Sequence, residues 1–260
     1  MTAPRESVGQ TLVLFLRVMR NLSRQPIWIG FMLVQPMFWL LLYSQLFRRI
    51  TDLHGFGTVS YVDYLTPGIA IMTAFFSGSW AGMGMIEDLD RGVIERFLTT
   101  PALRSAIVWG RIVQSGFVST LQALVVLVVG LALGAGNGGV LGWLVILAAS
   151  GLIGAGLAGF SNGIALLTRR EESMIAVANF ISLPLLFFSS ILIARSLIPG
   201  WMRGASLANP VEWAVRAARG HVLPGTSWGQ IGLYLGLLAM FTAVTGLFAT
   251  RCFSAYQRTL

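Results

Sequence analysis

The sequence has no lysine, one cysteine and two histidines, so several kinds of chemistry are closed to it. Without lysine it cannot form the P-loop motif G-x-x-x-x-G-K-[ST], whose lysine reaches the β- and γ-phosphates of ATP. Lysine-based Schiff-base and general-base chemistry is excluded for the same reason. Cys252, His54 and His221 are too few for a Cys/His zinc cluster or an intrachain disulfide. We therefore expect no catalytic residue, metal or cofactor in this chain, and any ATP and Mg would be bound by a partner.

Charge is also scarce. Charged residues make up 11% of the 260 residues, whereas soluble domains have roughly 25%. Hydrophobic residues make up 55% and the mean hydropathy is +0.76, which indicates a polytopic membrane protein in contact with lipid. The net charge of +8 could suggest nucleic acid. Arginines that flank membrane spans explain it more simply, so we expect no nucleic-acid partner.

The positions of the charges predict an all-α integral membrane protein with six transmembrane helices in one domain, residues 1–260. A helix needs about 20 apolar residues to cross the hydrocarbon core. The uncharged stretch from Ile112 to Thr168 is too long for one helix, and the glycine-rich run at 134–139 indicates a turn between two. The predicted spans are residues 27–47, 64–86, 112–133, 140–167, 173–194 and 228–250.

The distribution of arginine predicts the orientation. Twelve arginines fall on the side of the two termini and six on the opposite side, so the positive-inside rule places both termini in the cytoplasm of a multi-pass protein of the cell (inner or plasma) membrane. Within residues 6–24, Gln10, Arg17, Asn21 and Arg24 share one helical face, which predicts an N-terminal interfacial amphipathic helix. A simple basic flank is the alternative.

The predicted spans contain no charged residue in their interiors. The lack of an intramembrane carboxylate argues against a secondary antiporter, and neither a charged ring nor a carbonyl filter indicates a channel. Polar and aromatic residues could line a path for an amphiphile, although helix packing and interfacial belts more often explain such residues. The candidate path residues are Gln35, Trp39, Tyr43, Phe76, Trp80, Asn179, Phe187 and Phe188.

Six charged residues lie within residues 87–96, directly after the second predicted span. The i,i+4 pairs that Arg91 makes with Glu87 and Glu95 favour a helix over 87–98, which Pro101 would end. Such a short amphipathic cytoplasmic helix could dock into a groove on a partner protein. An ordinary solvated loop remains an equal alternative.

Small residues recur at intervals of four in two of the predicted spans. The fourth span has Gly151, Ala155, Gly159 and Gly163, and the second has Gly78 and Gly82. Residues this small let helix backbones approach closely in lipid. We expect helix packing from them and no further role.

Two segments resemble those of ABC-2 type exporter permeases. DLDRGVIERFLTTPALRSAIVWGRI, residues 88–112, is similar to the stretch after the second span of that family. Its matching positions are Gly92, Glu95, Arg96, Thr100 and Pro101, while valine at 93 replaces a small hydroxyl residue. LIPGWMRGASLANPVEWAVRAARG, residues 197–220, resembles the segment between the family's last two spans, with Asn209, Pro210 and Arg216 at matching positions. The drug-resistance exporters of the daunorubicin type are the most similar branch.

The resemblance implies a fold and two functional segments. Residues 87–98 would form a coupling helix against an ABC ATPase subunit, and residues 196–226 would form short re-entrant helices outside the cytoplasm, which would explain four of the six arginines there. The implied coupling residues are Glu87, Asp88, Asp90, Arg91, Gly92, Val93, Ile94, Glu95, Arg96 and Phe97. The implied residues of the re-entrant segment are Asn209, Pro210, Glu212 and Arg216.

The resemblance further implies a transport subunit and not an enzyme. The chain would pair with a second copy of itself or a paralogous permease, and the separate ATPase would drive export of an amphipathic drug or lipid from the cytoplasm or inner leaflet. A permease for a glycan or lipid-linked polysaccharide has the same architecture. A secondary multidrug transporter is a weaker alternative, and a membrane-embedded enzyme the weakest, because no predicted span has an acid, a cysteine or a metal-ligand set.

Overall fold

The computed structural model of the chain describes residues 26–46, 61–94, 104–136, 139–191, 199–220 and 226–258. The predicted interfacial helix over 6–24 lies outside them, as do the predicted coupling residues Glu95, Arg96 and Phe97.

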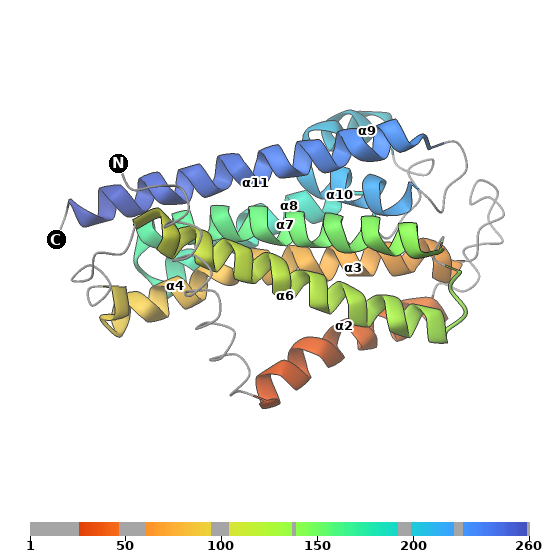
Figure 1. The fold of residues 1–260 in the computed structure, drawn as a ribbon, viewed down its shortest axis with the longest axis horizontal. Helices are drawn as coiled ribbons and strands as arrows, with labels where there is room; N and C mark the ends of the chain where they lie inside the picture. Colours follow the sequence, from red (N-terminus) through yellow and green to blue (C-terminus); the bar gives the residue numbers. More distant parts are fainter. Residues whose placement is uncertain are drawn as a thin grey trace.

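The regular elements in these ranges are all helical, and most of them run side by side along one axis (Figure 1). The sequences of these helices are mostly apolar. Each helix pairs its own backbone N–H and C=O groups, as a membrane requires because lipid offers no hydrogen-bond partner. The helices are α2 (Pro26–Leu46), α3 (Tyr61–Ser79), α4 (Ala81–Asp90), α6 (Arg104–Ala132), α7 (Gly139–Thr168), α8 (Glu171–Phe187), α9 (Gly200–Ala205), the 3-10 helix η3 (Ser206–Ala208), α10 (Pro210–Arg219) and α11 (Trp228–Gln257).

Four helical stretches in the described part of the chain are long and apolar enough to cross a membrane: Tyr61–Asp90, Ser105–Ala132, Gly139–Thr168 and Trp228–Gln257. They lie where the second, third, fourth and sixth spans are predicted. Helices α2 and α8 lie at the first and fifth predicted spans, but α8 ends at Phe187 after 17 residues, whereas the prediction continues to residue 194. The chain is an all-helical membrane protein, and the count of six spans stays a prediction.

Helix α7 lies at the centre of the bundle and contacts α3, α4, α6, α8, α10 and α11. Its small residues make this possible, because neighbours occupy the space that larger side chains would need. A Cβ on Gly156 would lie 2.6 Å from the ring of Phe241, and one on Gly159 would lie 2.9 Å from the hydroxyl of Thr245. The small residues of the fourth predicted span therefore serve close helix packing.

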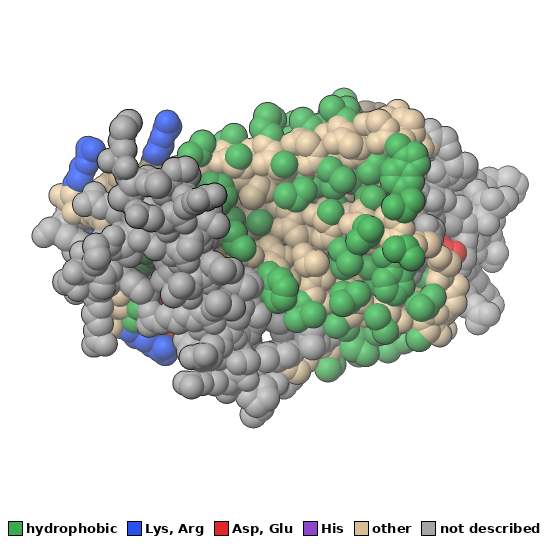
Figure 2. Space-filling model, viewed as in Figure 1, with side chains coloured by type: hydrophobic (Ala, Val, Ile, Leu, Met, Phe, Trp, Pro, Cys, Tyr) green, Lys and Arg blue, Asp and Glu red, His purple; other side chains and the backbone are tan. Residues whose placement is uncertain are grey.

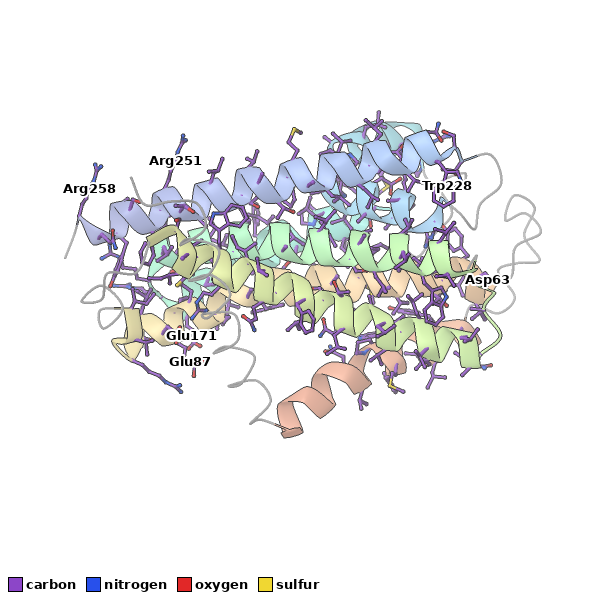
Figure 3. All side chains as sticks on the ribbon, in the orientation of Figure 1. Asp63, Glu87, Glu171, Trp228, Arg251 and Arg258 are labelled. Carbon is purple, nitrogen blue, oxygen red and sulfur yellow. The ribbon has the colours of Figure 1, made fainter. Side chains whose placement is uncertain are left out.

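The surface of the bundle is suited to contact with lipid. Hydrophobic side chains cover the middle of the face shown in Figure 2, and arginines extend from one end. In Figure 3, Glu87, Glu171, Arg251 and Arg258 lie at that end, which we call the arginine end, and Asp63 lies at the opposite end. An apolar band between two charged ends is the pattern expected of a membrane-embedded bundle.

Two predicted helices differ from those in the structure. The second predicted span is interrupted, because α3 ends at Ser79 and α4 begins at Ala81. The predicted helix over 87–98 is also interrupted: α4 ends at Asp90, Gly92 has a φ of 63°, and helical geometry resumes at Val93. Glycine adopts this left-handed conformation at little cost and commonly ends helices in this way. The prediction of one continuous helix was therefore wrong at Gly92.

Helix α6 begins before the third predicted span. Helix α6 starts at Arg104, whereas the prediction starts at residue 112 because it treats Arg111 as a boundary. In the structure Arg111 lies inside the helix, since its guanidinium pairs with Asp88 and donates to the Gly84 carbonyl at 3.0 Å. An arginine that is paired in this way need not mark the end of a helix.

Candidate functional site

The start of α10 is fastened to the end of α8 by one side chain. The Oδ1 atom of Asn209 accepts a hydrogen bond from the Val211 N–H at 2.9 Å, and Pro210 follows as the first helical residue. This is the usual chemistry of a helix N-cap. The Asn209 Nδ2 group donates to the carbonyls of Leu185 at 2.7 Å and Phe188 at 3.0 Å. Asn209 therefore also donates hydrogen bonds to carbonyls of the last turn of α8, which have no N–H partner within their own helix.

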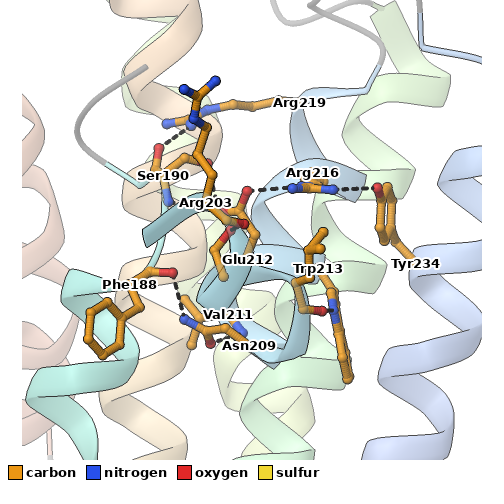
Figure 4. A network of polar contacts seen from close by, with 12 residues as sticks. Phe188, Ser190, Arg203, Asn209, Val211, Glu212, Trp213, Arg216, Arg219 and Tyr234 are labelled. Atoms are coloured by element: carbon orange, nitrogen blue, oxygen red, sulfur yellow. Dashed lines mark hydrogen bonds and ion pairs between the residues drawn. The ribbon is translucent and has the colours of Figure 1, made fainter. Parts of the chain in front are cut away.

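Glu212 follows one turn later and is only 1% exposed. Its Oε2 atom accepts from the N–H and the hydroxyl of Ser190, both at 2.8 Å, and its Oε1 atom accepts from Arg216 Nε at 2.9 Å (Figure 4). Arg216 in turn donates to the hydroxyl of Tyr234 on α11 at 2.8 Å. Burial raises the pKa of the Glu212 carboxyl, while the hydrogen bonds from Ser190 and the charge of Arg219 act against that rise.

Arg219 lies at the last residue of α10 and is 2% exposed. Its guanidinium donates to the carbonyl of Tyr64 at 3.0 Å and to the carbonyls of Ser190 and Ile191. It also lies 3.6 Å from the centre of the Tyr64 ring, which is a cation–π distance. Gly68 makes room for it, because a Cβ there would lie 2.6 Å from an Arg219 nitrogen. Arg219 thus ties the chain after α8 to α3.

Together these side chains form one buried network, which we call the α10 network: Tyr64, Ser190, Asn209, Glu212, Arg216, Arg219 and Tyr234. It joins α3, the end of α8, α10 and α11. Glu212 is a buried carboxylate near two arginines, and both arginines are also hydrogen-bonded to other groups, so the arrangement is fixed. Removing one partner would leave a buried charge uncompensated, at a high cost in stability.

Arg219 was not predicted as a site residue from the sequence, where it counts only among the arginines opposite the termini. Glu212, Arg216 and Arg219 lie at intervals of four and three, so they share one helical face, and this was the available signal. The spacing predicts a common face, but it does not show that the face is buried against α3 and α11. Glu212 is a carboxylate buried among the helices, and it lies outside the four candidate spans.

The described coupling residues form a charged turn at the arginine end. Glu87 and Arg91 pair at 2.6 Å with both side chains exposed, and Asp90 is exposed as well. Asp88 is paired with Arg111 and so fastens α4 to α6. Ile94 is 1% exposed and belongs to this chain's own core, which leaves the exposed charges for a partner.

The predicted path residues do not gather in one cavity of the described chain. Trp39 and Tyr43 stack on each other with ring centres 5.3 Å apart, and Phe188 meets Trp201 edge-on at 6.0 Å. The others lie on the outside of the described bundle: Gln35, Phe76, Trp80, Asn179 and Phe187. An apolar pocket does lie between the end of α3, α7 and α8, but none of the predicted path residues lines it.

Replacing Arg219 tests the α10 network. Arg219→Met takes a donor from three buried carbonyls and removes a positive charge near buried Glu212, so we expect the free energy of unfolding to fall by about 3–5 kcal/mol. Arg219→Lys keeps the charge but loses the forked geometry, so its loss should be smaller. Thermal unfolding of the purified chain in lipid nanodiscs measures both.

The matched control is Arg203→Met, which removes an exposed arginine of α9. We expect it to change stability by no more than about 0.5 kcal/mol. Equal unfolding temperatures for Arg219→Met and Arg203→Met would contradict the network's role.

Comparison of the sequence with known proteins identifies the family of this chain. The model of the ABC-2 type transporter family matches residues 9–223. The chain is 25% identical over 246 residues to the daunorubicin resistance ABC transporter permease protein DrrB1 of Streptomyces coeruleorubidus, covering 92% of this chain and 85% of the relative. It is 28% identical over 226 residues to the putative transport permease ycf38 of Cyanophora paradoxa, covering 85% and 76%.

A third relative is the probable doxorubicin resistance ABC transporter permease protein DrrC of Mycobacterium tuberculosis strain H37Rv. It is 23% identical over 226 residues, covering 86% of this chain and 80% of the relative. The family model extends over most of the chain, from before α2 to beyond α10. The chain belongs to the ABC-2 type transporter family and is a membrane permease.

Proposed function

We propose that the chain is the permease subunit of an ATP-driven exporter that moves an amphipathic or hydrophobic compound, a drug or a lipid, out of the cytoplasm or the inner leaflet. The observation on which this depends is the family match over residues 9–223. The names of two relatives, which are resistance permeases for daunorubicin and doxorubicin, support a compound of this kind. The complete lack of lysine supports ATP hydrolysis by a separate subunit.

The charged turn is the proposed contact with the ATPase. Glu87, Asp90 and Arg91 are exposed there, so they can set the register with charges on a partner. The turn is also fastened to the bundle, through buried Ile94 and through the pair that Asp88 makes with Arg111. A displacement applied to the turn would therefore be passed to α4 and α6.

The proposed path lies between two permeases. Several candidate path residues point outward from the described bundle, among them Phe187, which is 69% exposed, and Phe76, which is 39% exposed. Helix α8 also exposes Phe180 at 81%. A second copy or a paralogous permease would enclose such faces, and aromatic side chains around an enclosed space suit an amphiphile.

The proposed orientation puts the arginine end in the cytoplasm of a cell membrane protein. Arg251 and Arg258 lie at that end, and Arg169 and Arg170 directly precede Glu171, which lies there too. The arginines of α10 are consistent with the positive-inside rule, which concerns charges in loops. Arg216 and Arg219 are held by partners inside the α10 network.

Docking is tested with the double variant Phe97→Ala, Glu95→Arg. The variant removes a proposed apolar anchor and reverses a charge, so the binding free energy should weaken by at least the contribution of one interface hot spot, about 2 kcal/mol. Affinity for the ATPase subunit should therefore fall about 30-fold or more. Co-purification and stimulated ATP hydrolysis measure the effect. The control also truncates an aromatic side chain and introduces an arginine, but at the opposite end: Trp228→Ala with Gln230→Arg, which should leave docking intact. Unchanged docking in the first variant would refute the assignment.

Orientation is tested by cysteine labelling in a Cys252→Ala background. Ser206 is a poor position because it is 3% exposed, whereas Leu207 next to it is 56% exposed. Leu207→Cys should react with a membrane-impermeant maleimide on intact cells, and Glu172→Cys at the arginine end should react only after permeabilisation. The reverse pattern would show that the termini are outside.

A further inference from the structure

The stretch Tyr61–Asp90 is long enough for one membrane-spanning helix, but its backbone is interrupted at Trp80. A regular helix would pair the N–H groups of residues 82 and 83 with the carbonyls of residues 78 and 79. At the break the Met83 N–H donates to the Trp80 carbonyl at 3.1 Å, three residues back. No proline causes this, since the proline of α3 is at position 67.

A serine from α7 takes part in the interrupted pattern. The Ser161 hydroxyl accepts from the Gly82 N–H at 2.8 Å and donates to the Ser79 carbonyl at 2.7 Å. A hydroxyl has one donor and two acceptor lone pairs, so both bonds can form together. Ser161 is 2% exposed, so these backbone groups have no access to water. A side chain inserted into the helical hydrogen-bond ladder is a recognised cause of a kink.

The hydrogen bonds at the break can be exchanged for those of a regular helix. In the broken arrangement the Ser161 hydroxyl accepts from Gly82 and donates to Ser79. In an unbroken helix those groups would bond to residues 78 and 83, and the serine hydroxyl could bond a carbonyl of its own helix. The Gly82 N–H and the Ser79 carbonyl therefore have a partner in both arrangements, as a two-state element needs.

The break lies against α7 and next to the apolar pocket. A Cβ on Gly82 would come within 2.6 Å of the Ser161 carbonyl, so the two backbones are in direct contact. The pocket is lined by residues of α3, α7 and α8, among them Ser79, Ser161, Met174 and Ala178. Ser79 and Ser161 thus belong both to the break and to the wall of the pocket, so a rearrangement of their hydrogen bonds takes place beside existing space in the packed core.

We propose that Ser161 is a positioning residue, the pivot on which α4 changes direction relative to α3 when the ATPase moves the charged turn. The proposal rests on the function proposed above. Helix α4 is about 15 Å long, so a tilt of about 10° at the break moves its Asp90 end by about 3 Å. The pair of Asp88 with Arg111 passes that displacement to α6.

The pivot is tested by electron–electron resonance distances between spin labels at Asp90→Cys and Arg251→Cys, in a Cys252→Ala background. Arg251 is an exposed residue of α11, so this distance reports the sideways displacement of the Asp90 end of α4. The full chain is measured in nanodiscs with its ATPase, without nucleotide and trapped with ATP and vanadate. We expect the distance to differ by up to about 3 Å between the two conditions, and Ser161→Ala should remove the difference.

Two controls separate a pivot from a general packing role. Ser150→Ala makes the same substitution on the same helix, at a fully buried hydroxyl with no hydrogen-bond partner in the described structure, so it should retain the nucleotide-dependent difference. Ser161→Thr keeps a hydroxyl and should restore it. If Ser161→Ala behaves like Ser150→Ala, or if the unmodified complex shows no difference, the pivot is refuted. Failure of the labelled chain and of the unlabelled chain to bind any ATPase would instead refute the proposed function.

Discussion

The constraint on which this structure depends is the need to pair every backbone polar group inside the protein, because lipid offers no hydrogen-bond partner. Continuous helices meet it by themselves. This chain has two described places where the helical pattern ends within the bundle, at Trp80 and after α8. At each one, side chains from another helix pair the freed groups: Ser161 at the first, and Asn209, Glu212 and Arg219 at the second.

The two places differ in how firmly they are held. The α10 network uses charges, a cation–π contact and several carbonyls, and losing one member would leave the others unpaired at high cost. Ser161 uses one neutral hydroxyl, and its two bonds can be replaced by those of a regular helix. In the proposed mechanism the α10 network keeps one part of the permease rigid, and the break at Trp80 lets the other part change direction when the ATPase displaces it. The ATPase would act on this second part, near Glu87 and Arg91.

Part of this fold could be predicted from the sequence. Apolar stretches bounded by charges locate four spans, because the length of a span follows from the thickness of the bilayer. The same reasoning does not locate the start of α6, because it treats a charge as the boundary of a span, and Arg111 is paired inside the helix. It also extended a helix through Gly92, whose left-handed φ ends α4. Neither an ion pair nor a left-handed backbone conformation follows from hydrophobic periodicity.

The candidate site was predictable only in outline. The sequence pointed to the segment containing Asn209, Glu212 and Arg216, but Arg219 and Ser161 depend on partners far along the chain, at Tyr64 and Gly82. A high-resolution cryo-electron microscopy map of the permease in a lipid nanodisc tests the central claim most directly. The account predicts the Ser161 hydroxyl between Ser79 and Gly82, and the Arg219 guanidinium among the carbonyls of Tyr64, Ser190 and Ile191. Ordered water in those positions, with both side chains turned away, would contradict it.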